Sequence, residues 1–337
     1  MEYRTLGRTG VKVSSLCLGC MMFGGKTDEG DSFAIIDRAI DAGINFFDTA
    51  NVYSRGRSEE VTGAALKRNG QRQRIVLATK VHGRMADDDP NMEGNSRRHI
   101  VAQCEASLRR LQTDYIDLYQ IHRPQSSIPI DETLRALDDL IRAGKVRYIG
   151  TSTFAAWQVV ESLWIAKELG LNRFVCEQPP YNLLDRRIER ELLPVAQTYG
   201  IGIIPWSPLA GGLLTGKYNR NQPPPPDSRF GELERAPHLQ RRWQEGVFDV
   251  TEGLVPLAEA KGCSLSQLAL AWCLQQPGVT SPIIGPRTMA QLEDNLGAQA
   301  VTLDDADRAR IDELIPPGRM VSPFYEADFG PHPHRLI

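Results

Sequence analysis

Four ionisable residues are the best candidates for chemistry in this sequence: Asp48, Tyr53, Lys80 and His122. Each lies at or just past the end of an apolar run typical of a β-strand, and these runs read INFFDTA, IVLATK and YIDLYQIH. In parallel α/β folds the C-terminal strand ends carry the active site, so we expect the four side chains to converge.

Together these four groups favour proton donation. A free tyrosine, with a pKa of about 10, is a poor acid at neutral pH. A nearby ammonium lowers that pKa, and Lys80 is the candidate. Asp48 would hold and compensate the buried lysine, and His122 would hydrogen-bond a substrate oxygen or relay the proton. Such a group would protonate an oxygen that becomes negative, as carbonyl reduction requires once a hydride has attacked the carbon.

Each residue also has a simpler interpretation. Asp48 could cap a helix, Tyr53 could anchor a loop, Lys80 could be a solvated strand end and His122 could stabilise a turn. Their joint placement after three successive strands favours the catalytic interpretation.

The elements that would position these residues alternate along the chain. Eight apolar runs are typical of strands: SLCLGC, INFFDT, IVLATKV, YIDLYQI, VRYIGTS, FVCEQ, IGIIPWS and SPIIG. Helix-like stretches with apolar spacings of three and four begin near Asp31, Ser58, Ser96, Asp131, Ala155, Arg187, Ser264 and Thr288. Ser58 and Asp131 are predicted to cap their helices. Eight such units predict an α/β fold, a (β/α)₈ TIM barrel formed by one domain over residues 1–337.

Further segments surround the predicted barrel. A turn signal at Gly7–Gly10 indicates an N-terminal hairpin. Two stretches without helix or strand patterns, at about 83–95 and 217–247, follow predicted strands, so we expect them to be substrate or cofactor loops on the catalytic face. The alternative is that they are inert surface excursions. A C-terminal tail covers residues 316–337.

Composition excludes several classes of protein. The 337 residues carry a formal net charge of -3 and are 41% hydrophobic, enough for a large core and without a general nucleic-acid or anionic-membrane surface. No apolar run approaches the roughly 18 residues of a membrane span. The N-terminus lacks the apolar core of a signal peptide, so we expect a cytoplasmic protein. Cys17 and Cys20 form a C-x-x-C without a second pair, which favours reduced, partly buried thiols and predicts no metal site.

The familiar nucleotide-binding motifs are absent. No G-x-G-x-x-G follows the first strand. The stretch Gly211–Lys217 nearly matches a phosphate loop, but Tyr218 replaces the serine or threonine that would hold magnesium. Its glycines still allow backbone N–H groups to approach a pyrophosphate.

Seven segments together resemble the aldo-keto reductase superfamily: GINFFDTANVYSRGRSEEVTGAAL, VLATKV, LRRLQTDYIDLYQIHRP, GKVRYIGTSTF, EQPPYNLL, IIPWSPLAGGLLTGKY and IIGPRTMAQLEDNL. The resemblance covers essentially the whole chain. It implies a barrel that binds NADP(H) in an extended form, and a catalytic tetrad of Asp48, Tyr53, Lys80 and His122 with Tyr53 as general acid. Channel-associated relatives can lack the histidine.

The resemblance also implies a set of cofactor contacts. Cys20, Met21, Ser152, Gln178 and Trp206 would surround the nicotinamide, with Trp206 stacked on its ring. The pyrophosphate would lie along Ser207, Pro208, Leu209 and Gly211, with Lys217 and Arg229 supplying positive charge. The adenosine 2′-phosphate and adenine would be held by Gly285, Arg287, Gln291, Asp294 and Asn295, at a helix N-terminus suited to anions. Thr153 stands where the family usually has asparagine, which puts a carboxamide contact from this residue in doubt.

These observations predict an NADPH-dependent reductase of an aldehyde or ketone, with a sugar-like or other small polar carbonyl favoured. One alternative is a nucleotide-binding regulatory or partner subunit with little turnover. Another is a Schiff-base aldolase that uses Lys80 as its nucleophile. The oligomeric state is open.

Overall fold

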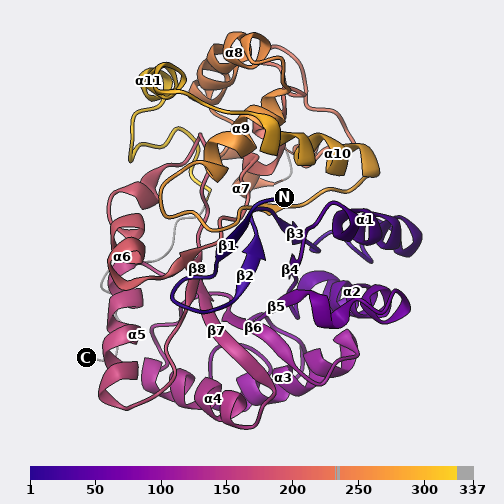
Figure 1. Cartoon of the computed structure of the whole chain (residues 1–337), viewed down its shortest axis with the longest axis vertical. Helices are drawn as coiled ribbons and strands as arrows, with labels where there is room; N and C mark the ends of the chain where they lie inside the picture. The colour runs from indigo at the N-terminus through magenta and orange to yellow at the C-terminus, as the bar shows by residue number, and fades with distance from the viewer. Residues whose placement is uncertain (232, 234–235, 325–337) are drawn as a thin grey trace.

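A closed parallel barrel forms the centre of the computed structural model, which describes residues 1–231, 233 and 236–324 (Figure 1). Its eight strands are β3 (Cys17–Gly19), β4 (Phe46–Asp48), β5 (Val76–Val81), β6 (Ile116–Ile121), β7 (Val146–Ser152), β8 (Cys176–Gln178), β9 (Gly202–Ile203) and β10 (Ile283–Ile284). They pair in parallel in the order β10-β3-β4-β5-β6-β7-β8-β9. A parallel bridge between Ile203 and Val279 closes the circle, and the Ile283 amide donates to the Pro205 carbonyl at 2.8 Å. The predicted (β/α)₈ barrel is confirmed.

An N-terminal hairpin closes one end of the barrel. Strands β1 (Tyr3–Thr5) and β2 (Lys12–Ser14) pair antiparallel, as the turn signal predicted. Leu6 and Val13 are fully buried and pack with inward-facing side chains of the barrel strands, including Phe46 and Leu118. Because this apolar plug fills the N-terminal strand ends, the opposite end is the one available for chemistry.

Eight helices surround the strands in the manner of a barrel: α1 (Glu29–Asp41), α2 (Arg57–Arg68), α3 (Arg97–Leu111), α4 (Ile130–Arg142), α5 (Ala156–Glu168), α6 (Leu192–Tyr199), α9 (Leu265–Leu274) and α10 (Met289–Gly297). Their apolar faces explain the packing. In α4, for example, Leu134 and Leu137 are fully buried one turn apart, whereas Arg135 and Asp139 face solvent.

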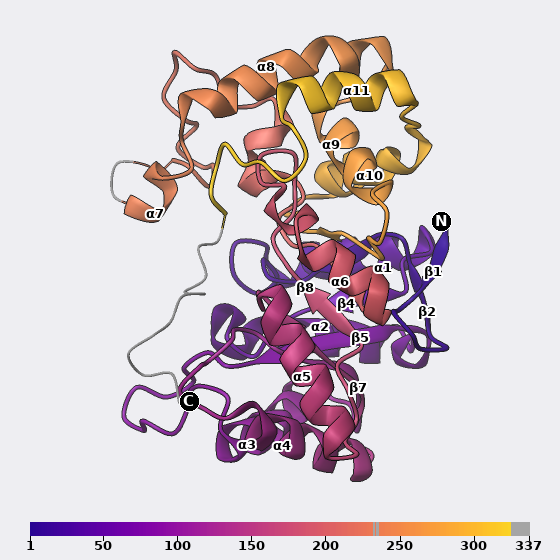
Figure 2. The same cartoon turned by 90° about the vertical axis from the view of Figure 1, so that its left-hand side faces the viewer.

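Three helices lie outside the predicted set. They are α7 (Pro237–Gln240), α8 (Glu245–Ala260) and α11 (Asp305–Leu314), and Figure 2 shows α8 and α11 side by side at one end of the molecule. The start of α8 shortens the long loop predicted over 217–247, which also contains α7.

Both predicted helix caps were wrong. Helix α2 has Gly56 at its N-cap and α4 has Pro129. The Ser58 hydroxyl instead donates to the Cys20 carbonyl at 2.7 Å, because Ser58 lies inside α2 on its buried face. Asp131 likewise lies in the first turn of α4 rather than before it.

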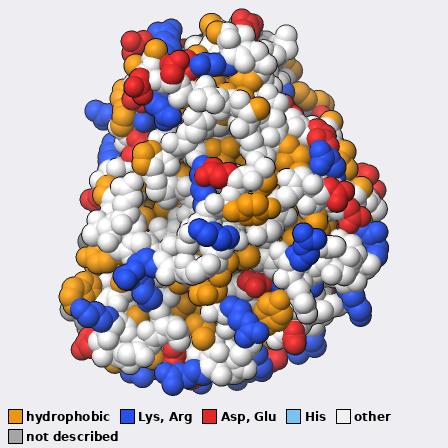
Figure 3. All heavy atoms as spheres, viewed as in Figure 1, with side chains coloured by type: hydrophobic (Ala, Val, Ile, Leu, Met, Phe, Trp, Pro, Cys, Tyr) orange, Lys and Arg blue, Asp and Glu red, His pale blue; other side chains and the backbone are white. Residues whose placement is uncertain are grey.

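The described part of the tail, 316–324, runs back along the segment that follows β8. The Arg186 amide donates to the Arg319 carbonyl, and the Val321 amide donates to the Leu184 carbonyl, both at 2.9 Å. Residues 325–337 of the predicted tail lie outside the described residues. On the face in Figure 3, basic and acidic side chains are interspersed. Within the described ranges, no helix has the length and apolar character needed to cross a membrane.

Candidate active site

Lys80 is the centre of the cluster at the C-terminal strand ends. Its side chain is fully buried on β5, and its Nζ donates to Asp48 Oδ1 at 2.5 Å, to the Thr49 carbonyl at 2.8 Å and to Tyr53 OH at 3.2 Å. Burial alone would lower the pKa of Lys80, but the charge of Asp48 and the contact with Tyr53 outweigh it and leave the pKa raised. Lys80 is therefore held as an ammonium.

Tyr53 reaches this cluster from a tight turn. It begins a 3₁₀ turn, Tyr53–Gly56, just after β4, in which Ser54 and Arg55 have positive φ values of 48° and 53°. Left-handed backbone is uncommon for such residues, so surrounding contacts must hold the turn in place. The turn brings the Tyr53 ring within 4.9 Å of the Lys80 ammonium.

His122 lies beside the phenol. The rings of Tyr53 and His122 meet edge to face, with centroids 5.6 Å apart. Burial lowers the pKa of His122 well below its usual value, and the nearby charges of Lys80 and Arg123 lower it further. The imidazole is therefore neutral at neutral pH and has an N–H to donate.

Asp48 is held at both of its oxygens. Oδ1 accepts from Lys80, and Oδ2 accepts from Gln178 Nε2 at 2.9 Å and from Gln120 Nε2 at 3.1 Å. Gln120 was missed by the sequence analysis. A signal was present, because Gln120 is a polar residue inside an apolar run and precedes His122 by two positions, which places both on one face of the strand.

The residues expected around a nicotinamide lie next to this cluster. The Ser152 hydroxyl donates to the Gln178 carbonyl at 2.8 Å. Half-buried Trp206 packs edge to face with Phe324 of the tail at 6.3 Å, and the Arg123 guanidinium lies 5.9 Å from its ring. Thr153 has a positive φ of 60°, and its hydroxyl donates to the Ser152 carbonyl at 2.6 Å, so this side chain is turned to its own backbone.

A glycine turn follows β9. Gly211 and Gly212 have φ values of 66° and 102°, and Ser207 is also left-handed at 54°. A Cβ at Gly211 would lie 3.2 Å from Arg229 Cδ, and one at Gly212 would lie 3.0 Å from Lys217 Nζ. The glycines therefore allow two cationic side chains to approach the backbone closely.

Three cations from two loops face each other here. Partial burial lowers the pKa of Lys217, with Arg287 and Arg229 adding to the effect, and burial and Arg287 lower that of Arg229. Arg287 Nη1 donates to the Asp227 carbonyl at 3.3 Å and so joins the loops after β9 and β10. The carboxylate of Asp227 opposes part of this effect, because its charge raises the pKa of Lys217. The three cations outnumber this one acid, and the excess of positive charge suits a bound anion.

The remaining predicted contacts are more scattered. At the start of α10 the Arg287 amide donates to Gln291 Oε1 at 2.8 Å. Asn295 is buried, whereas Gly285 is exposed. Asp294 instead faces α9 and accepts from the Ser264 hydroxyl at 2.7 Å. Pro208 is buried, whereas Leu209 is half-buried and packs on the core. Met21 is exposed, and burial raises the pKa of the Cys20 thiol to about 12.

Comparison with known proteins agrees with this arrangement. The model of the Aldo/keto reductase family matches residues 15–316. The chain belongs to the aldo/keto reductase family. An uncharacterized oxidoreductase of Bacillus subtilis, YrpG, is 42% identical over 94% of this chain and 96% of its own.

Other relatives of this aldo/keto reductase carry a different description. A probable voltage-gated potassium channel subunit beta of Arabidopsis thaliana is 42% identical over 88% of this chain and 91% of its own. A putative subunit of the same kind from Schizosaccharomyces pombe is 40% identical over 88% of both chains.

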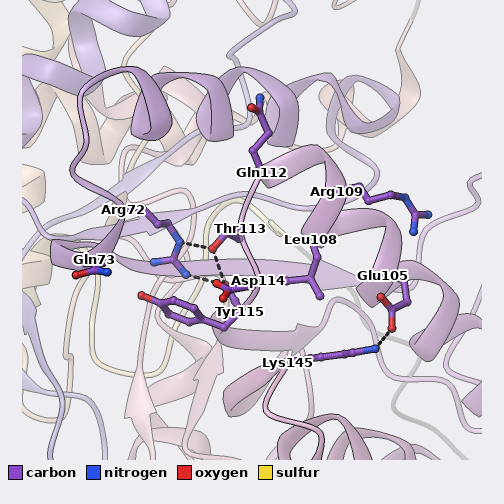
Figure 4. A pocket seen from close by; sticks show the side chains of 10 residues that line it. All are labelled: Arg72, Gln73, Glu105, Leu108, Arg109, Gln112, Thr113, Asp114, Tyr115 and Lys145. Carbon is purple, nitrogen blue, oxygen red and sulfur yellow. Dashed lines mark hydrogen bonds and ion pairs between the residues drawn. The ribbon is translucent and has the colours of Figure 1, made fainter.

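A hollow of about 730 Å³ lies away from the tetrad of this aldo/keto reductase (Figure 4). It is lined by residues that precede β5, β6 and β7, including Arg72, Tyr115 and Lys145. The Arg72 guanidinium stacks on Tyr115 at 4.1 Å and pairs with Asp117 at 2.9 Å. These side chains stabilise the N-terminal strand ends, the end of a barrel where stability rather than catalysis is expected.

Proposed function

We propose that this aldo/keto reductase is an NADPH-dependent enzyme that reduces an aldehyde or ketone to an alcohol. One observation carries the proposal: a fully buried ammonium, Lys80, is bonded at once to Asp48 and to the hydroxyl of Tyr53. A lysine exposed at the surface needs neither contact. A tyrosine that acts as an acid needs a nearby ammonium to stabilise its phenolate, and a buried ammonium needs a carboxylate to balance its charge.

The residues would act in the following way. Tyr53 OH hydrogen-bonds the substrate oxygen and gives up its proton as negative charge develops there. The phenolate left behind is stabilised by the Lys80 ammonium at 3.2 Å, whose position Asp48 fixes. Neutral His122 donates a second hydrogen bond to the same oxygen and orients the carbonyl. A bound nicotinamide would supply the hydride to the carbonyl carbon.

The chain offers groups that fit such a dinucleotide. Ser152 and Gln178 would hold the carboxamide, and Trp206 would stack on the ring; its buried Nε1 has no hydrogen-bond partner among the described residues. Both hydrogen bonds donated by Gln178 use Nε2, so Oε1 is the atom that a carboxamide N–H would meet.

At the other end the glycine turn with Lys217 and Arg229 would receive the pyrophosphate. Arg287, Gln291 and Asn295 would receive the 2′-phosphate and adenine. A dianionic 2′-phosphate would offset the positive charge gathered there, which favours NADPH over NADH.

The substrate class follows from the loops around the tetrad. The 83–95 loop follows β5 and the 217–247 segment follows β9, so both leave the C-terminal strand ends. Arg229 of the second segment lies beside Gly211, and Phe324 of the tail packs on Trp206. A small polar carbonyl, such as a sugar-like aldehyde, suits this surrounding better than a large apolar one.

A regulatory role is the second candidate, because two of the relatives above are named as potassium channel beta subunits. Both candidates require nucleotide binding, and only the reductase requires turnover. A Schiff-base aldolase is disfavoured, because the nucleophile would have to be a neutral amine and the pKa of Lys80 is raised.

A carbonyl screen that follows NADPH absorbance, with NADH in parallel, separates these candidates. The reductase predicts turnover of at least one aldehyde or ketone and faster turnover with NADPH. Tight NADPH binding without oxidation across a broad panel would favour the regulatory role.

A further inference from the structure

Asp48 of the tetrad meets two buried amide side chains inside the barrel. Asp48, Gln120 and Gln178 are at most 3% exposed, and their side chains form a closed set of hydrogen bonds. Only Asp48 and Gln178 belong to the sites proposed above. Gln120 belongs to neither site. Burial of an amide side chain in a barrel core costs folding free energy unless its polar atoms are hydrogen-bonded.

The strand register explains why Gln120 points inward. Lys80 of β5 pairs with Gln120 of β6, and Gln120 pairs with Gly150 of β7. Residues in register on neighbouring strands share a face of the sheet, so Gln120 lies beside Lys80. Gly150 makes room for it, since a Cβ there would lie 3.3 Å from Gln120 Cγ and only 2.4 Å from Cys176 Sγ.

A second amide fixes the orientation of Gln120. Gln178 Nε2 donates to Gln120 Oε1 at 3.2 Å, so the nitrogen of Gln120 is turned towards Asp48 Oδ2. Gln178 also donates directly to that oxygen at 2.9 Å. With Oδ2 held by two neutral donors, Oδ1 is left to pair with Lys80.

We propose that Gln120 is a positioning residue that fixes the Asp48 carboxylate, so that the Lys80 ammonium stays within reach of Tyr53. The inference rests on the proposed reductase function and deepens it. Without Gln120 the buried carboxylate loses one of the two amide donors to Oδ2, and the remaining donor, Gln178, loses its own contact with Gln120, so Asp48 can turn further towards Lys80. The Lys80 ammonium would then follow the carboxylate and move away from the Tyr53 hydroxyl. Since Gln178 belongs to the same set, the tetrad is also linked to the nicotinamide side of the site.

Two substitutions separate this role from simple packing. Gln120→Met keeps a similar volume without a donor. It is expected to lower kcat by about 10- to 100-fold, the range for one hydrogen bond to a charged group, with KM and NADPH affinity within about twofold. Gln120→Glu has the same shape and donates only while its carboxyl is protonated.

The glutamate variant gives the sharper readout, a pH profile. Next to Asp48 a second buried carboxyl has a raised pKa, because burial and like charge both disfavour its ionisation. Gln120→Glu is therefore expected to approach wild-type kcat at acidic pH and to lose activity as pH rises, whereas Gln120→Met is low throughout. A kcat for Gln120→Met equal to wild type, or the same ratio of Gln120→Glu to wild type at every pH, would overturn the proposal.

A measurement that needs no turnover keeps this inference separate from the proposed function. Wild type is assayed in parallel, and a wild type without turnover on any carbonyl counts against the reductase assignment alone. Unfolding free energies in urea are then compared for Gln120→Met, Asp48→Asn and the double variant. The proposal predicts that Gln120→Met costs clearly more in the wild-type background than in the Asp48→Asn background; equal costs in both backgrounds would refute it.

Discussion

Lys80 and Asp48 form an ion pair of 2.5 Å that joins β5 to β4 inside the barrel. The lysine side chain is fully buried and that of the aspartate is 4% exposed, so neither charge is screened by solvent. Such a pair adds little net stability, because desolvation offsets the attraction, but the loss of one partner leaves the other uncompensated. Its geometry therefore suits a functional role better than a stabilising one.

Removal of one partner of this pair is expected to destabilise the fold. Lys80→Met should lower the free energy of unfolding by about 3–5 kcal/mol, because Asp48 is left buried without its cation. Lys80→Met combined with Asp48→Asn should cost less than Lys80→Met alone. Urea unfolding of wild type, Lys80→Met and the double variant measures this, and a double variant less stable than Lys80→Met would contradict it.

Acidification is expected to destabilise the protein through three histidines. Burial lowers the pKa values of His82, His99 and His122 below the usual 6.5. Below that pH the unfolded chain binds more protons than the folded one, so stability falls as pH drops through about 6.5. Unfolding curves recorded from neutral pH to pH about 5 give the slope of the free energy of unfolding against pH. His82→Asn should make it shallower, and an unchanged slope would exclude His82 from this effect.

Glu177 is expected to act in the opposite direction. This fully buried carboxyl accepts from the Phe154 amide at 3.1 Å, and burial raises its pKa from 4.5 to about 8. Between these values the folded state holds a proton that the unfolded state lacks, so this contribution to stability is lost as pH rises. Glu177→Gln should therefore gain stability relative to wild type from pH 5 to pH 9. A constant difference across that range would argue against a raised pKa.

Arg287 is expected to select the phosphorylated cofactor. Arg287→Ala should weaken NADPH binding by about 10-fold or more and leave NADH binding nearly unchanged, because only NADPH carries the 2′-phosphate. Fluorescence titration measures both affinities. Arg310→Ala is a matched control, since Arg310 is an exposed arginine on α11 paired with Glu313. An equal loss of affinity for both nucleotides would mean that Arg287 contacts a part that NADPH and NADH share, and not the 2′-phosphate.

The barrel could be predicted from the sequence because its signals are local. Runs such as IVLATKV are apolar on both faces, and each is followed by turn residues and a helical repeat. Helix α11 was missed although Asp304 caps it, because its exposed, charged sequence carries little apolar periodicity. Helix α8 was obscured by Gly253 and by Pro256 within it.

The candidate site could be predicted only in part, because contacts between strands are not encoded locally. Residues that end strands, such as Asp48 and Lys80, are positioned by local sequence. The partners of these residues depend on register across strands, which links Gln120 to Lys80 and Gly150 and has no local signal. Contacts of the tail, such as Phe324 against Trp206, join segments more than a hundred residues apart.

The central claim is that Tyr53 donates the proton, and Tyr53→Phe tests it most directly. The variant keeps the ring beside His122 and removes only the hydroxyl that Lys80 reaches at 3.2 Å. With a carbonyl that wild type reduces, measured kcat should fall by at least about a hundredfold, while NADPH affinity stays within about twofold. Turnover by Tyr53→Phe close to that of wild type would contradict the account.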